Sequence, residues 1–226
     1  MARSGRFTRS PWSLLAHNVP QEEPRRFNTG RLVPAAQLSP DALLTRRRDV
    51  EENIFVHVER HHLEPILQGG FANADEFLTA AHRITNRRKA RSGRSLELHL
   101  AQVFRECGVQ FECQAQTELR KKPDFLFPSG RAYHDARFPA QRLRMLAAKT
   151  CCKDRWRQVA SEADRIEEKH LFTLQRGVSE NQLDEMLSLR VQLVIPESNR
   201  TMFPTPHRPS LMNLSSFVTM IADMQQ

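Results

Sequence analysis

Three charged residues in the middle of the chain could together hydrolyse a phosphodiester. Asp124 precedes the apolar run 125–127, Lys149 follows the apolar run 146–148, and Glu162 lies on the segment that comes next. Carboxylates are hard oxygen ligands that suit Mg²⁺. A lysine beside them can orient or activate a water against a phosphate, while a metal stabilises the charge that develops. On a basic chain, these residue types indicate metal-dependent phosphodiester hydrolysis.

Each of the first two residues also has a simpler interpretation. Asp124 follows Lys-Pro and could belong to a surface turn, where aspartate is common. Lys149 could extend to solvent from the end of its strand. Against both alternatives, the flanking runs are apolar enough to be buried strands, and a lysine at the end of a buried strand is costly to desolvate. We therefore favour metal ligation by Asp124 and a catalytic role for Lys149.

The elements that position these residues follow from the apolar pattern. Five strands are predicted, at about 109–116, 123–128, 143–150, 171–175 and 191–196. Helices are predicted between and after the later strands, at 153–168, 179–189 and 213–224. Strands that alternate with helices indicate an α/β fold with a central mixed five-stranded sheet flanked by helices. Glu162 is then expected on the helix 153–168.

The part of the chain before the sheet is predicted to be helical. Capping residues mark the expected helix ends, namely Ser39 with Pro40, Gly69 with Gly70, Asn73, and Gly108. They predict a helix after Ser39, a second after Asn73, and a third over about 92–107. Residues 1–38 are expected to form an irregular arm. Residues 39–226 are expected to be a single catalytic domain, with a helical part (39–107) and a sheet core (108–226).

Composition is consistent with an intracellular protein that binds a polyanion. The chain has 226 residues, a formal net charge of +8 and a pI near 9.9, which favours nucleic acid as a partner. The abundance of arginine could also reflect a GC-rich genome. The four cysteines lack zinc-site spacing and are interpreted as reduced thiols in a cytoplasmic protein. No apolar run is long enough to span a membrane.

Several segments resemble the catalytic domain of EcoRII-type restriction endonucleases, a branch of the PD-(D/E)XK nucleases. The similar segments are Arg91–Leu100, Lys121–Pro128, Leu146–Gln158, Ser161–Arg165, Lys169–Gln175 and Val191–Pro196. In the usual pattern of the superfamily, the second acid lies two residues before the lysine, where this chain has Ala147. The resemblance implies that the acid has moved to the position of Glu162, as it has elsewhere in this branch.

This resemblance also implies an activity and a set of partners. Asp124 and Glu162 would bind Mg²⁺, and Lys149 would act on the water in a type II restriction endonuclease that cuts double-stranded DNA at a CCWGG-like or CCNGG-like site. A homodimer would match a palindromic site, and a cognate DNA methyltransferase would be expected in the same system. Because only a short arm precedes the catalytic part, a stand-alone enzyme that needs no second effector site is expected.

Further candidates lie around this set. Lys153, Asp154 and Arg155 match the segment with which the family reads G·C pairs; Arg or Lys can contact guanine and Asp can contact cytosine. They could equally be the charged first turn of a helix. Glu97 could assist the metal site or be a surface charge. Tyr133 could position a phosphate or pack as a half-buried aromatic.

The basic residues of the helical part are also candidates for DNA contact. Arg47, within the run 46–48 and near Phe55, could contact phosphate or help to form a base-stacking pocket, or could simply be solvated. Arg94 is a further candidate for DNA binding. Two other functions stay open: a repair endonuclease of the same fold that acts on mismatches or damage, and a catalytically inactive DNA-binding protein.

Overall fold

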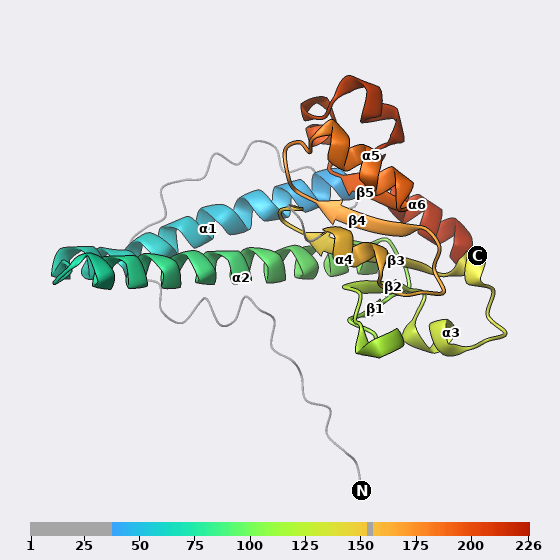
Figure 1. Cartoon of the computed structure of the whole chain (residues 1–226), viewed down its shortest axis with the longest axis horizontal. Coiled ribbons are helices and arrows are strands. Elements are labelled where there is room, and N and C mark those ends of the chain that lie inside the picture. Colours follow the sequence, from blue (N-terminus) through green and yellow to red (C-terminus); the bar gives the residue numbers. More distant parts are fainter. Residues whose placement is uncertain (1–37, 153–155) are drawn as a thin grey trace, which may run out of the picture.

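The computed structural model describes residues 38–152 and 156–226. It begins with two long helices, α1 (Pro40–Gly69) and α2 (Ala74–Glu106), which lie side by side and extend away from the rest of the molecule (Figure 1). The predicted capping residues are confirmed: the Ser39 hydroxyl accepts a hydrogen bond from the Ala42 amide, and the Asn73 side chain accepts one from the Glu76 amide. No helix within the described residues is long and apolar enough to cross a membrane.

Where two helices were predicted after Asn73, the structure has the single helix α2, so that prediction was wrong. A glycine within a helix costs only about 1 kcal/mol relative to alanine. Gly93 therefore does not end the helix. It ends instead at Gly108, which has a φ of 70°, and the Val109 amide donates to the Phe104 carbonyl across this turn. This is the bonding pattern by which a left-handed glycine closes a helix.

Within the described residues, six strands form one mixed sheet in the order β1-β2-β3-β4-β5-β6. The strands are β1 (Glu112–Cys113), β2 (Phe125–Phe127), β3 (Arg144–Lys149), β4 (Lys169–Thr173), β5 (Val191–Ile195) and β6 (Met212–Asn213). The first two pairings are antiparallel and the last three are parallel. The mixed α/β sheet is confirmed; β6 was not predicted, because two residues are too few to show an alternating pattern.

The remaining helices connect or flank these strands. They are α3 (Gly130–His134), α4 (Trp156–Ala160), α5 (Glu180–Ser188) and α6 (Leu214–Gln225), with short 3₁₀ segments at Glu118–Arg120, Ala140–Arg142, Glu197–Met202 and Thr205–Ser210. The predicted helices at 179–189 and 213–224 are thus confirmed. Helices α1, α2 and α6 contribute to the apolar core on one face of the sheet, whereas α4 and α5 contribute to the core on the other face.

A cluster of aromatic rings fixes α2 against the strand that follows Asp124. The ring of Phe104 on α2 lies 5.2 Å from that of Phe125 and 5.4 Å from that of Phe127, both on β2, and 6.2 Å from that of Phe217 on α6. All four side chains are buried. Edge-on aromatic pairs of this kind stabilise a core beyond the effect of their buried area. They hold β2, and with it Asp124, in a fixed position.

Candidate functional site

The topology of the sheet brings Asp124 and Lys149 together. β2 and β3 are antiparallel, with Phe125 opposite Leu146, so the residue before β2 lies beside the end of β3. Asp124 Oδ2 accepts a hydrogen bond of 2.8 Å from Lys149 Nζ and one of 2.7 Å from the Ala148 amide. The Asp124 side chain is 13% exposed and that of Lys149 is 27% exposed. This charged pair therefore lies at the surface end of two buried strands, where a substrate can reach it.

The alternation of side chains along β3 fixes the face on which Lys149 lies. Leu146 and Ala148 pack into the core beneath α1, α2 and α6, whereas Met145 and Ala147 pack into the opposite core, with α4 and α5. Successive strand residues point to opposite faces, so Lys149 lies on the face of Ala147. Ala147 occupies the place of the usual second acid and is fully buried; a methyl group there cannot bind a metal.

The position of Glu162 differs from the prediction. Helix α4 ends at Ala160, so Glu162 follows the helix rather than lying on it. The expected helix 153–168 is therefore present over 156–160, was wrong beyond Ala160, and begins with three residues that lie outside the described ones. A helix could not continue to residue 168 beyond this end, because Ala163 adopts a φ of 50°, which a helix does not allow. The segment 161–166 is instead an irregular turn that runs back to β4.

Despite this difference, Glu162 lies within the electrostatic field of the other two residues. Its pKa is raised to about 7, chiefly because burial removes water from the carboxylate. The negative charge of Asp124 raises this pKa further, while the positive charge of Lys149 opposes the shift, followed by those of Lys121 and Lys169. Glu162 therefore lies close enough to Asp124 and Lys149 for their charges to act on its carboxylate.

The donor set of this site suits a hard divalent cation. The Glu162 carboxylate is half-buried, and both its burial and the charge of Asp124 raise its pKa. A bound cation would stabilise the charged form of such a group. Mg²⁺ is commonly held by one or two carboxylates together with substrate phosphate and waters. Within the described residues, no group of three or more His, Cys, Asp or Glu side chains converges on a metal position. Asp124 and Glu162 would then supply the protein ligands, with oxygens of DNA and water as the others.

Glu97 and Arg94 lie on α2 and pair with each other. Arg94 NH1 donates to Glu97 Oε2 over 3.2 Å, and the Glu97 side chain is 23% exposed. Both residues also act on the nearby thiol of Cys113, whose pKa is raised chiefly by burial. The charges of Arg105 and Arg94 lower this pKa, and the charges of Glu97 and Asp124 raise it. Glu97, Arg94 and Asp124 therefore all lie close enough to Cys113 to act on its thiol. Within the described residues, neither Glu97 nor Arg94 forms a hydrogen bond or ion pair with Lys149.

Tyr133 lies inside the protein on α3, and only 1% of its surface is exposed. Its hydroxyl donates to the Glu118 carboxylate over 2.6 Å and accepts a hydrogen bond of 3.1 Å from the Arg165 amide. Burial and the Glu118 carboxylate raise the pKa of the phenol. A phosphate cannot reach a hydroxyl in this position without a rearrangement, so the structure favours the alternative in which this aromatic residue packs.

The basic residues near the start of α1 are engaged within the helical pair. Arg47 forms a 2.6 Å ion pair with Glu106 on α2. The Phe55 ring is covered by the Arg91 guanidinium, whose carbon lies 3.5 Å from the ring centre. Lys153, Asp154 and Arg155, the expected DNA-reading residues, lie outside the described residues.

Two lysines near Glu162 were not singled out from the sequence. Lys121 Nζ donates to the Ser161 carbonyl, and Lys169 Nζ donates to the Ala163 carbonyl over 2.7 Å and to that of Ile166. Lys121 lies far from Glu162 in the sequence, and only the fold brings it there, whereas Lys169 follows Glu162 by seven residues at the start of β4. Because a lysine that donates to backbone carbonyls has no distinctive sequence pattern, no signal in the chain could have identified either of them.

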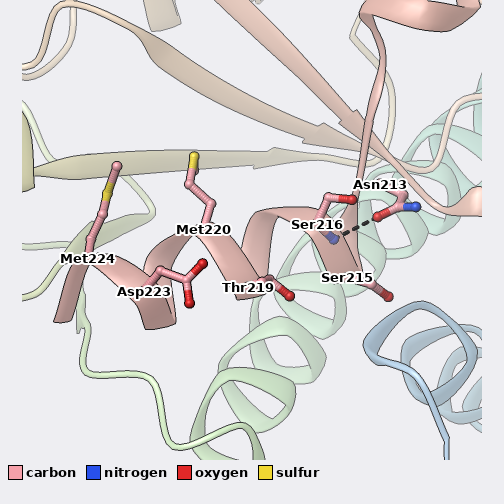
Figure 2. Close-up of a pocket in the computed structure, with 7 residues that line it drawn as sticks. All are labelled: Asn213, Ser215, Ser216, Thr219, Met220, Asp223 and Met224. Atoms are coloured by element: carbon pink, nitrogen blue, oxygen red, sulfur yellow. Dashed lines mark hydrogen bonds between the residues drawn. The ribbon is translucent and has the colours of Figure 1, made fainter. Parts of the chain in front are cut away.

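A separate surface hollow follows one side of α6 (Figure 2). At the N-terminal end of α6, on the right in Figure 2, the Ser216 amide donates a 2.7 Å hydrogen bond to Asn213 Oδ1. Its lining residues are Asn213, Ser215, Ser216, Thr219, Met220, Asp223 and Met224. With Asp223 as the one acid in this lining, the hollow has no set of metal ligands, and it does not include Asp124, Lys149 or Glu162.

Comparison with known proteins shows the family to which the chain belongs. The family model described as EcoRII C terminal matches residues 55–218, which is most of the chain. The chain belongs to the EcoRII C-terminal family. Among curated relatives, the type II restriction enzyme EcoRII of Escherichia coli is 53% identical over 182 residues. This match covers 80% of the present chain but 45% of EcoRII, so the chain spans less than half the length of that relative.

Solved structures share the fold at low sequence identity. Metal-depleted Ecl18kI in complex with uncleaved, modified DNA has a TM-score of 0.66 at 17% identity, covering 84% of this chain and 73% of that one. The complex of the restriction endonuclease PspGI with substrate DNA has a TM-score of 0.65 at 14% identity, covering 82% and 80%. The family membership and the restriction-endonuclease fold implied by the sequence resemblance are thereby confirmed.

Proposed function

We propose that the protein is a Mg²⁺-dependent type II restriction endonuclease that cleaves double-stranded DNA. The observation that carries this proposal is the 2.8 Å pair of Asp124 and Lys149 at the joined ends of β2 and β3, with Glu162 in the same electrostatic field. Membership in the EcoRII C-terminal family supports it, as do the two structural relatives, both of which are complexes with DNA.

Each residue has a defined part in the proposed reaction. Asp124 and Glu162 hold Mg²⁺, which when bound supplies positive charge to the scissile phosphate. Lys149, released from its pairing with Asp124, orients the attacking water and helps to remove its proton. The water oxygen attacks phosphorus in line, the bond to the 3′ oxygen breaks, and that oxygen takes a proton. The products carry a 5′-phosphate and a 3′-hydroxyl.

The proposed target is a CCWGG-like or CCNGG-like site, bound by a homodimer whose two-fold symmetry matches the site. Lys153, Asp154 and Arg155 directly follow the segment that leads from Lys149, and they are proposed to read G·C pairs beside the cut. Arg94, exposed on α2 near Glu97 and Asp124, is proposed to contact the DNA backbone. A cytoplasmic location and a cognate methyltransferase that protects the host site belong to the same proposal.

Digestion of an unmodified plasmid of known sequence tests the proposal. Fragment ends should map to one recurring site, carry 5′-phosphates, and form only when Mg²⁺ is present. Cleavage restricted to mismatched or damaged duplexes would indicate a repair enzyme instead. Binding without cleavage over a range of divalent cations would indicate a DNA-binding protein that has lost catalysis.

A further inference from the structure

The turn that carries Glu162 is held by side chains outside it, most of which lie far away in the sequence. A carboxylate on a helix is placed by the helix itself, but Glu162 follows the end of α4 and has no such support. Fixing a loop residue in one conformation costs about 1–2 kcal/mol of backbone entropy. The contacts around the segment 161–166 show how this turn is nonetheless held in place.

The first anchor is Lys169, at the start of β4. This lysine is 5% exposed, and its ammonium donates to the carbonyls of Ala163 and Ile166. A buried ammonium is stable only when its donors are satisfied. The residue directly after Glu162 is therefore tied to the sheet through Lys169.

The second anchor is the pair formed by Tyr133 and Glu118. The Asp164 amide donates to Glu118 Oε2 over 3.2 Å, and the Arg165 amide donates to the Tyr133 hydroxyl over 3.1 Å. Tyr133 and Glu118 are themselves joined by the 2.6 Å bond from the hydroxyl to the carboxylate. Two consecutive amides of the turn are thus held by one hydrogen-bonded pair, in which Tyr133 is buried and Glu118 is half-buried.

The third anchor lies on the other side of Glu162. Lys121 Nζ donates to the Ser161 carbonyl and lies 3.9 Å from the Asp164 carboxylate. The Arg165 guanidinium closes the far end of the turn, donating to the Phe138 carbonyl over 2.9 Å. Glu162 consequently has a fixed backbone group on either side, although its own side chain takes no part in these bonds.

We propose that Tyr133 and Glu118, together with Lys169, are positioning residues that fix the carboxylate of Glu162 for divalent-metal binding. This inference rests on the proposed function, in which Glu162 is a metal ligand. It gives Tyr133 a role in the site without contact with substrate. Residues that orient a metal ligand typically change metal affinity or activity by about 10–100-fold when they are replaced.

The test compares Mn²⁺ binding, measured by calorimetric titration, in the wild-type protein and in Tyr133→Phe. The substitution removes only the hydroxyl, and we expect the Kd for Mn²⁺ to rise about 10-fold. Ser129→Ala is the matched control. It removes the hydrogen bond of 3.1 Å that caps the same helix α3, but does not touch the turn, and its Kd for Mn²⁺ should equal that of the wild type. Glu118→Gln provides a second variant if Tyr133→Phe does not fold.

A double substitution separates positioning from general loss of stability. If Tyr133 acts through Glu162, then Tyr133→Phe should weaken Mn²⁺ binding no further in a Glu162→Gln background. Equal weakening in Tyr133→Phe and Ser129→Ala, or a wild-type Kd in both Tyr133→Phe and Glu118→Gln, would overturn the inference. A wild-type protein that neither binds Mn²⁺ nor cleaves DNA would refute the proposed function, and the positioning role with it.

Discussion

Replacing Asp124 should separate catalysis from stability in a way that depends on which residue replaces it. One oxygen, Oδ2, accepts both from Lys149 Nζ and from the Ala148 amide. Asparagine keeps a side-chain oxygen that can accept from the Ala148 amide, but it loses the charge needed to bind a metal and to pair with Lys149. Alanine loses both. The two variants should therefore be alike in activity and different in stability.

The expected magnitudes follow from these contacts. A buried amide left without an acceptor costs about 1–3 kcal/mol, and in a chain of this size each 1 kcal/mol lowers Tm by about 2–4 °C. Asp124→Ala should accordingly melt several degrees below the wild type, while Asp124→Asn should melt close to it. Both should cleave at least about 10²-fold more slowly, since each removes a group that stabilises charge at the scissile phosphate.

The assay is single-turnover cleavage of a labelled duplex by excess enzyme, with thermal unfolding measured on the same preparations. Lys149 is 27% exposed and can turn to water in both variants, so it should contribute little to the difference in Tm. An Asp124→Asn protein that cleaves within about 10-fold of the wild-type rate would refute the ligand role. An Asp124→Asn protein as unstable as Asp124→Ala would refute the assigned hydrogen bond to Ala148.

Three further predictions concern metal, DNA reading and pH. Mn²⁺ should replace Mg²⁺ in cleavage, whereas Ca²⁺ should support DNA binding but not turnover, because it is larger and polarises water less; turnover with Ca²⁺ at the Mg²⁺ rate would contradict this. Arg155→Ala should weaken binding to the specific duplex by about 1–3 kcal/mol, and by less for a scrambled duplex at the same salt; equal losses would make Arg155 a phosphate contact. Burial lowers the pKa of His170 to about 3, from a usual value near 6.5. Between these two pH values the unfolded chain binds a proton that the folded chain does not. The free energy of unfolding should therefore decrease as pH drops through this range, by up to about 1.4 kcal/mol per pH unit. His170→Leu should flatten this slope in urea unfolding, and an unchanged slope would contradict the assignment.

The sequence predicted the parts of the site that depend on local pattern. Asp124 and Lys149 were placed at strand ends by the apolar runs beside them, and the sheet brings those ends together because β2 and β3 are antiparallel. Both strands are buried over their apolar residues. Short buried runs bounded by charged or turn residues are the pattern that sequence reasoning interprets most directly.

The surroundings of Glu162 could not be predicted in the same way. The segment 153–168 has a composition that permits a helix, but the chain leaves the helix after Ala160. Its new path is stabilised by Glu118 and Tyr133, which come from separate parts of the sequence, and by Lys169 at the start of the next strand. Such tertiary contacts override local helix propensity. The same limitation applies to Tyr133, whose hydroxyl partners only the fold reveals.

The central claim is that Asp124 and Glu162 act as one metal-binding unit, although Glu162 lies outside the usual superfamily position. It is tested most directly by the single-turnover rates of Asp124→Asn, Glu162→Gln and the double variant in saturating Mg²⁺. Residues that act as a unit show strongly non-additive losses. The account predicts that each single substitution lowers the rate at least about 10²-fold, and that the double variant is no slower than the slower single variant. A Glu162→Gln protein that cleaves near the wild-type rate, or losses that multiply in the double variant, would contradict it.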